Sequence, residues 1–197
     1  MKKNILLITL FLLGLSTASA QSVGIGLRAG LNLASEYISN NQSPGSSNST
    51  RTGFLLGVYT KFMIASKVGI QPELYYSSTG TTITDQSSSG TITSNYLSLP
   101  VFFRYNASNN FHLLVGPQFG ILMAAKTTVG SVSVDIKDQF NSTDIGGVVG
   151  FGFDFGPFNA GTRYNFGLSN IEKNSFGGEK VRNMVFQIVA GYRLFGK

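Results

Sequence analysis

The sequence contains no cysteine, no tryptophan and a single histidine, His112. Without cysteine, the chain cannot form a disulfide scaffold or a thiolate metal site. One histidine argues against a histidine-rich metal centre, so we expect neither a metal nor a cofactor. Charged residues make up only 12% of the 197 residues, whereas an average soluble domain has roughly 25%. This length favours a single domain.

Long apolar runs are missing after the first twenty residues. Lys2 and Lys3 precede the apolar run Ile5–Leu15, and small residues follow at Ala18–Ala20. This order is typical of a secretory signal peptide, and the run is shorter than the roughly 20 residues of a membrane-spanning helix. We therefore predict a cleaved signal peptide over residues 1–20 and one domain over residues 21–197.

Helical periodicity is also missing, and apolar and polar residues alternate instead in blocks of about ten. In Val68–Ser77, for example, Ile70 and Leu74 share one face of the predicted strand, and Gln71 and Glu73 share the other. We count eight blocks of this kind: Val23–Leu33, Thr52–Met63, Lys67–Thr79, Asn95–Tyr105, Phe111–Met123, Asp144–Phe155, Phe158–Ser169 and Asn183–Leu194.

The connections between these blocks alternate between long and short. The long ones are Ala34–Arg51, Gly80–Ser94, Ala124–Thr143 and Asn170–Arg182, and the short ones are Ile64–Ser66, Asn106–Asn110 and Gly156–Pro157. An even number of strands, with short turns at one rim and long loops at the other, is typical of outer-membrane barrels. The sequence predicts an all-β fold, an eight-stranded antiparallel up-and-down transmembrane β-barrel with both termini at the periplasmic rim.

The two faces of the predicted strands have opposite character. One face combines many glycines with charged or titratable side chains: Arg28, Lys61, Glu73, Arg104, His112, Asp154, Arg163 and Arg193. Small and long side chains together can fill the narrow lumen of an eight-stranded barrel. The other face is bulky and apolar, as a lipid-facing surface is. The inverse arrangement, with the apolar face inside, is the alternative of a secreted, soluble, lipocalin-like binder.

Aromatic residues of the apolar face gather at two heights, as at the two lipid interfaces of outer-membrane barrels. The group nearer the short turns is Phe62, Phe103, Tyr105, Phe111, Phe153, Phe155, Phe158 and Tyr192. The group nearer the long loops is Phe54, Tyr76, Tyr164, Phe166 and Phe186.

The charges of the polar face form the one candidate site. Because an unpaired buried charge is costly, we expect Glu73 to pair with Arg28 and Arg163. The set has two interpretations, an ion-pair plug that holds a solid lumen, or a basic passage or anion site. Since the excess positive charge lies mainly on this inner face, we predict no nucleic-acid binding.

His112 is the only candidate for a catalytic imidazole. Some outer-membrane barrels are lipid hydrolases that use a histidine with a nearby serine, but the next inward residue is Leu114. We expect His112 to lie opposite Arg104 across the hairpin, as a polar residue at the rim. The sequence therefore predicts no enzymatic activity.

Several short segments resemble the PorT-type outer-membrane β-barrel family, which is abundant in Bacteroidetes. They are Arg28–Leu33, Ile70–Ser77, Tyr96–Val101, Val115–Gln118, Asp144–Gly146, Arg163–Tyr164 and Gly191–Leu194. The resemblance implies an integral outer-membrane barrel whose partners are outer-membrane lipid and, during biogenesis, the barrel-assembly machinery. Some relatives belong to secretion and gliding machinery, which implies an envelope or secretion complex as a further partner.

The function predicted from these observations is structural or interactive, through the extracellular loops or within an envelope complex. A narrow transport or secretion-associated component is the first alternative. The soluble lipocalin-like binder is the second.

Overall fold

The computed structural model describes residues 22–38, 47–84, 89–173 and 180–196. The predicted signal peptide lies outside this part of the chain. The described residues form nine strands and one short 3-10 helix: β1 Ser22–Ile38, β2 Ser47–Met63, β3 Val68–Thr84, β4 Ser89–Asn106, β5 Phe111–Val129, β6 Val132–Asp135, η2 Lys137–Gln139, β7 Thr143–Phe155, β8 Phe158–Gly167 and β9 Val181–Gly196.

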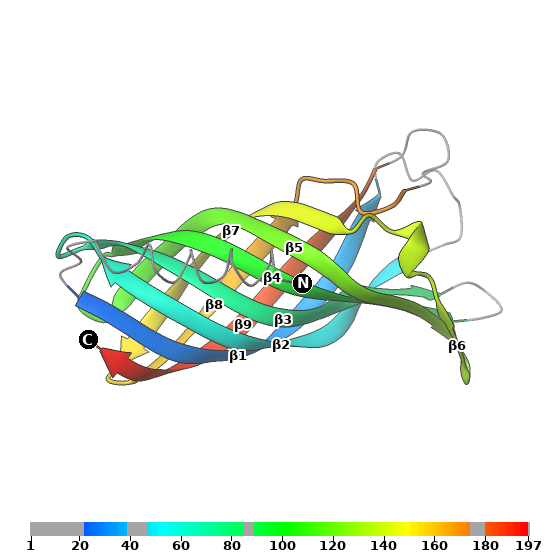
Figure 1. Cartoon of the computed structure of the whole chain (residues 1–197). Coiled ribbons are helices and arrows are strands. Elements are labelled where there is room, and N and C mark those ends of the chain that lie inside the picture. Colours follow the sequence, from blue (N-terminus) through cyan, green and yellow to red (C-terminus); the bar gives the residue numbers. More distant parts are fainter. Residues whose placement is uncertain (1–21, 39–46, 85–88, 174–179, 197) are drawn as a thin grey trace, which may run out of the picture.

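Eight of the strands close into a barrel (Figure 1). Each of them pairs antiparallel with its neighbours in the order β1–β2–β3–β4–β5–β7–β8–β9, and β9 returns to pair with β1. Closure pairs both edges of every barrel strand, which a sheet exposed to lipid requires. The ring confirms the predicted fold class of an eight-stranded up-and-down barrel.

Short turns join β2 to β3, β4 to β5 and β7 to β8, at the end where β1 begins and β9 finishes. The tightest is Gly156–Pro157, where Gly156 has φ 62°. A positive φ at the first position followed by the fixed negative φ of proline is the type II′ combination, whose twist matches a hairpin. We call this end of the barrel the short-turn rim and the opposite end the long-loop end.

Most predicted strands stop too early at the long-loop end, whereas β8 ends at Gly167, two residues before the predicted Ser169. β1 runs to Ile38 instead of Leu33, and β5 runs to Val129 instead of Met123. Apolar alternation follows the lipid-facing stretch, whereas the backbone ladder continues beyond it with polar residues that water can solvate. The predicted strand ends therefore mark the edge of the apolar surface and not the end of pairing.

β6 was also missed, since the sequence predicts a loop over Ala124–Thr143. In the structure, β6 pairs with the end of β5 from Val129↔Val132 to Lys126↔Asp135, around a two-residue turn that begins at Gly130 with φ 59°. This hairpin reaches beyond the barrel (Figure 1). The available signal was Gly130–Ser131 flanked by Val129 and Val132, with β-branched residues before it and alternating valine and serine after it.

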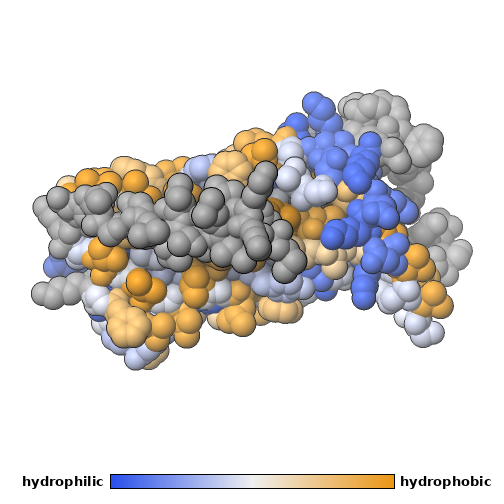
Figure 2. All heavy atoms as spheres, in the orientation of Figure 1, coloured by the Kyte–Doolittle hydropathy of each residue, from blue (hydrophilic) through white to orange (hydrophobic). Residues whose placement is uncertain are grey.

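The outer surface of the barrel is apolar and the interior is polar. Orange, hydrophobic residues cover the barrel wall in Figure 2, and blue, hydrophilic ones gather toward the long-loop end. Exposed large apolar side chains include Leu27 and Leu31 on β1, Phe54 and Leu56 on β2, and Phe151 and Phe153 on β7. The soluble alternative is therefore wrong, because it requires the apolar face inside. No helix in the described residues is long and apolar enough to cross a membrane.

Aromatic contacts occur at both predicted heights of the outer surface. Near the short-turn rim, the ring centroids of Phe158 and Tyr192 lie 5.1 Å apart. Toward the long loops, those of Phe54 and Tyr76 lie 6.0 Å apart. Both pairs are tilted, which is a favourable aromatic geometry.

An apolar cluster lies at the long-loop end. Ile136, Phe140 and Ile171, from the segments after β6 and β8, are buried against the barrel. Their partners on the strands are Tyr96, Leu122, Ala125 and Val181. Phe140 and Glu172 form an isolated antiparallel bridge that joins the two segments. We call Ile136, Phe140 and Ile171 with these partners the apolar cap.

Candidate functional site

The middle of the lumen is organised around one carboxylate, Glu73. Arg163 contacts it with both terminal nitrogens at 2.7 Å, and Arg28 Nη2 lies 3.0 Å from Glu73 Oε1. The three side chains come from β1, β3 and β8 and are at most 3% exposed. Charge-assisted, bidentate contacts of this kind are the strongest hydrogen bonds that side chains form.

Aromatic rings and amides hold the two guanidiniums in place. Arg28 lies 4.5 Å from the centroid of the Tyr59 ring, and Arg163 lies 4.6 Å from that of Phe102. Arg28 also donates a hydrogen bond to Asn159 Oδ1, and Asn159 donates to the Tyr59 hydroxyl at 3.0 Å. Cation–π contacts are strengthened when water is excluded, as it is from these buried side chains.

Glycines on the neighbouring strands give these side chains their space. A Cβ at Gly150 would lie 2.8 Å from Arg163 Cγ, and one at Gly191 would lie 2.9 Å from Arg28 Nη1. Both distances are shorter than a side chain tolerates. The glycines of the inner face thus allow long cationic side chains to cross a narrow lumen.

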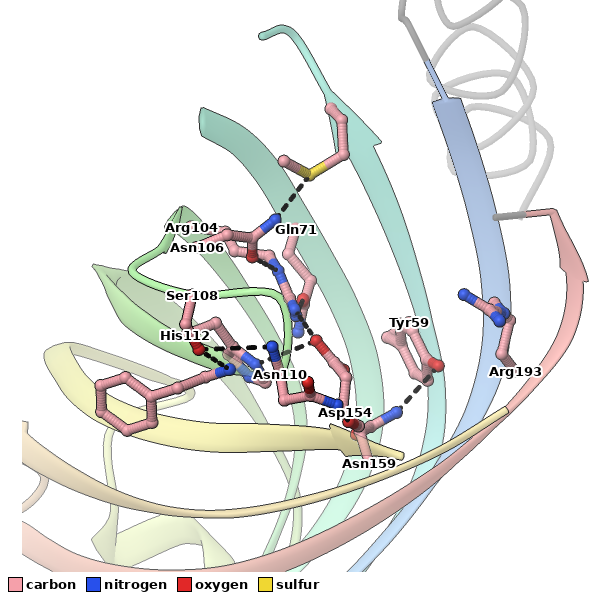
Figure 3. Close-up of polar contacts among 12 residues, drawn as sticks. Tyr59, Gln71, Arg104, Asn106, Ser108, Asn110, His112, Asp154, Asn159 and Arg193 are labelled. Atoms are coloured by element: carbon pink, nitrogen blue, oxygen red, sulfur yellow. Dashed lines mark hydrogen bonds and ion pairs between the residues drawn. The ribbon is translucent and has the colours of Figure 1, made fainter. Parts of the chain in front are cut away.

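A second charged cluster lies at the short-turn rim, around Asp154 (Figure 3). Arg104 Nη2 donates to Asp154 Oδ2, and His112 Nδ1 lies 3.2 Å from the same oxygen. Gln71 links the two clusters, since it accepts from Arg104 at 2.9 Å and donates to Glu73 at 2.7 Å.

The predicted hairpin pairing of His112 with Arg104 is wrong. His112 lies opposite Asn106, and Arg104 lies opposite Leu114. The partner of His112 lies two residues further along β4 than predicted, and Asn106 belongs to β4. His112 and Arg104 still meet, through their shared partner Asp154.

Lys61 and Arg193 complete the predicted set at the short-turn rim. Among the described residues neither forms an ion pair, and Arg193 Nη2 donates only to the Gly156 carbonyl, at 3.2 Å. Both side chains line a small pocket at the mouth of the barrel, with Tyr59 and Asp154. The eight predicted residues thus separate into a buried triad and a rim group.

Polar contacts continue from the triad toward the long-loop end. Tyr75 donates to Gln118 at 2.8 Å, and Asn32 donates to Ser77 Oγ at 2.9 Å and accepts from Gln187 at 3.0 Å. The sequence analysis did not single out these uncharged residues, although each lies on the polar face. Their alternation with apolar residues was the available signal, since nothing else distinguishes a lumen amide from a surface one.

Glu36 lies where the lumen meets the apolar cap, beyond the apolar exterior stretch that ends at Leu33. Its side chain is buried, with 8% of the residue exposed, and Oε1 has no hydrogen-bond partner in the described residues. Burial, and secondarily the negative charge of Glu172, raises the pKa of Glu36 to about 7. This carboxyl group therefore holds its proton more tightly than an exposed glutamate does.

No hydroxyl group forms a hydrogen bond with His112 in the described residues, and Asp154 is shared with Arg104. Within the same residues, no three histidine, aspartate or glutamate side chains are grouped so that they could hold a metal ion. What the lumen residues do chemically is to neutralise and hydrogen-bond one another across the barrel.

A closed barrel with a lipid-like exterior and a polar interior defines an outer-membrane β-barrel protein. The family model described as "Outer membrane protein beta-barrel domain" matches residues 19–173. The chain belongs to this family, and its location is the outer membrane. No curated protein matches it in sequence.

Solved structures similar to this chain are small outer-membrane barrels. Ail, the attachment invasion locus protein of Yersinia pestis, is 16% identical with a TM-score of 0.50, and the match covers 87% of this chain and 98% of Ail. Neisserial surface protein A is 13% identical with a TM-score of 0.51, and the match covers 86% of this chain and 97% of that protein. At these levels of sequence identity, the similarity shows a shared fold only.

Proposed function

We propose that this protein is a non-conducting, non-enzymatic outer-membrane barrel that acts through its long-loop end. The observation that carries the proposal is the chain of contacts across the lumen, from Asp154 through Arg104 and Gln71 to Glu73 and Arg163. Side chains that pair with one another across an eight-stranded barrel leave little room for an aqueous path. The apolar cap supports the same reading at the other end.

The long-loop end offers the surface for interaction. The β5–β6 hairpin extends past the barrel and exposes Val129, Val132 and Val134, each more than half exposed. On this proposal the short-turn rim and both termini face the periplasm, and the hairpin faces the exterior. Partners are then met outside the cell or within an envelope complex.

Single-channel recording in a planar bilayer tests the proposal. The wild-type protein is expected to give no conductance steps. A variant that hollows the lumen, Arg28→Ser with Glu73→Ser and Arg163→Ser, is expected to conduct if it still folds, which a heat-dependent gel shift checks. Regular steps from the wild-type protein would overturn the proposal.

The PorT-type resemblance favours a second candidate, a component of a secretion complex. Deletion of the gene in its native host separates the two. Loss of secreted proteins, restored by the wild-type gene and also by one lacking residues 127–134, would favour the secretion role over action through the hairpin. An unchanged set of secreted proteins supports the first proposal.

A further inference from the structure

The pocket at the short-turn rim contains more positive charge than its own carboxylate neutralises. Its charged lining residues are Lys61, Arg104, Asp154 and Arg193, three cations and one anion. Asp154 is already engaged by Arg104, and His112 lies on the same oxygen. Lys61 and Arg193 therefore form no ion pair among the described residues, and the lining of the pocket has an excess of positive charge.

The register places these two cations on either side of β1. Lys61 on β2 lies opposite Gly24, and Arg193 on β9 lies opposite Gly26. Because both facing residues are glycines, no β1 side chain separates Lys61 from Arg193. Two strand spacings and an offset of two residues along β1 separate their backbones by about 12 Å, a span that the two long side chains can close over one anion.

Tyr59 supplies a third donor to the same pocket. Its hydroxyl oxygen accepts from Asn159 Nδ2 at 3.0 Å, and no acceptor for the hydroxyl proton occurs in the described residues. A hydroxyl group both accepts and donates, so this proton remains available to a ligand. In Figure 3, Tyr59 lies between Asp154 and Arg193.

We propose that this pocket binds a phosphate group, held between Lys61 and Arg193 with the Tyr59 hydroxyl as a further donor. Ammonium, guanidinium and phenol donors that reach one point from two strands suit a tetrahedral oxyanion. The cavity has room for about one water molecule, so the phosphate group sits at its open mouth and the remainder of the ligand lies outside the barrel. The inference is independent of whether the lumen conducts.

Titration with inorganic phosphate tests the site. The refolded barrel is kept in a maltoside detergent, which contains no phosphate, and chloride maintains a constant ionic strength. Amide resonances of Lys61, Arg193 and Gly156 are expected to shift in a saturable way in the millimolar range. Shifts that do not saturate, or that spread evenly over the barrel, would overturn the proposal.

Two variants make the test specific. Lys61→Gln with Arg193→Gln is expected to weaken binding by about tenfold or more, because both charge-assisted contacts are lost. Lys67→Gln is the matched control, since Lys67 is an exposed lysine in a turn of the same rim. Equal loss in both proteins, or no loss in the double variant, contradicts the site.

Competition with a short-chain phosphatidic acid distinguishes the sources of the phosphate. Displacement of inorganic phosphate by this lipid, but not by its phosphatidylcholine counterpart, identifies a lipid headgroup as the ligand. Binding of inorganic phosphate without displacement by either lipid identifies a soluble phosphate compound. Both results support the site, and they differ only in the ligand.

Discussion

The middle of the lumen and the long-loop end each contain a buried glutamate. The surroundings of the first stabilise the charged carboxylate, and those of the second disfavour it. Glu73, with its side chain fully buried, lies between Arg28 and Arg163 and accepts a further hydrogen bond from Gln71. Glu36 is nearly as buried, yet one of its oxygens has no hydrogen-bond partner in the described part of the chain, and the carboxylate of Glu172 is nearby.

The difference shows that burial alone does not decide whether a carboxylate stays charged. Removing a carboxylate from water costs several kcal/mol, at least part of which nearby cations offset. Glu73 has two such cations. The pKa of Glu36 is raised instead, so that its carboxyl group holds a proton more tightly. Ion pairs therefore hold the middle of the lumen together, whereas at the long-loop end the apolar cap lies beside a carboxyl group whose pKa is raised by burial.

Replacing Glu73 with glutamine tests the first half of this comparison and carries the largest expected effect. Glu73→Gln leaves two buried guanidiniums without their carboxylate, which is expected to lower the free energy of unfolding by about 3–5 kcal/mol. Urea unfolding of the refolded protein, followed by the heat-dependent gel shift, measures the change.

A triple variant is the control for that measurement. Replacing Arg28 and Arg163 with methionine and Glu73 with leucine removes the charges together and retains apolar volume. We expect it to lose much less stability than Glu73→Gln, because no buried charge is left uncompensated. A triple variant as unstable as the single one would show that the triad matters for its hydrogen-bond geometry and not for charge balance.

The pH dependence of the free energy of unfolding tests the part of the comparison that concerns Glu36. Because the pKa of Glu36 is about 7 in the fold and 4.5 ordinarily, the folded protein binds this proton more tightly than the unfolded chain does. The group's contribution is most favourable below about pH 4.5, falls as the pH rises toward 7, and is constant above that. The total loss is about 3 kcal/mol.

Unfolding at about pH 5 and about pH 8 measures this effect. Glu36→Gln is expected to flatten the dependence and to be more stable than wild type at the higher pH. Asp135→Asn, at an exposed residue of β6, is the matched control and should retain the wild-type slope. If the free energy of unfolding of Glu36→Gln depended on pH as steeply as that of wild type, another group would be responsible for the pH dependence.

Much of the barrel could be predicted because each strand repeats one simple pattern. Val68–Ser77 alternates strictly, so the inward position of Glu73 follows from parity alone. The contacts of Glu73 with Arg28 and Arg163 could be anticipated because few cations share its height in the lumen. Charge balance and strand geometry are enough for both steps.

The hairpin register, the amide partner of Arg28 and the extension of β5 could not be predicted from the alternation of polar and apolar residues. The hairpin turn before His112 has several acceptable lengths, and the one adopted moves Arg104 opposite Leu114. The partner of Arg28 on β8, Asn159, is one amide among several on the polar face. β5 extends beyond the apolar surface, where the change to polar residues does not mark the end of the strand.

Asp154 is intermediate between Glu73, which has two cationic partners, and Glu36, whose charge has no cationic partner among the described residues. Its replacement is expected to have the smallest effect on stability. Its side chain is 29% exposed and is paired with Arg104, so water already screens part of the interaction. Asp154→Asn is expected to lower the free energy of unfolding by about 1 kcal/mol. Raising the salt from about 0.1 M to about 1 M should remove much of the difference between this variant and wild type, and leave most of the Glu73→Gln difference in place. Equal salt sensitivity for the two variants would mean that water reaches the middle of the lumen as readily as it reaches the rim.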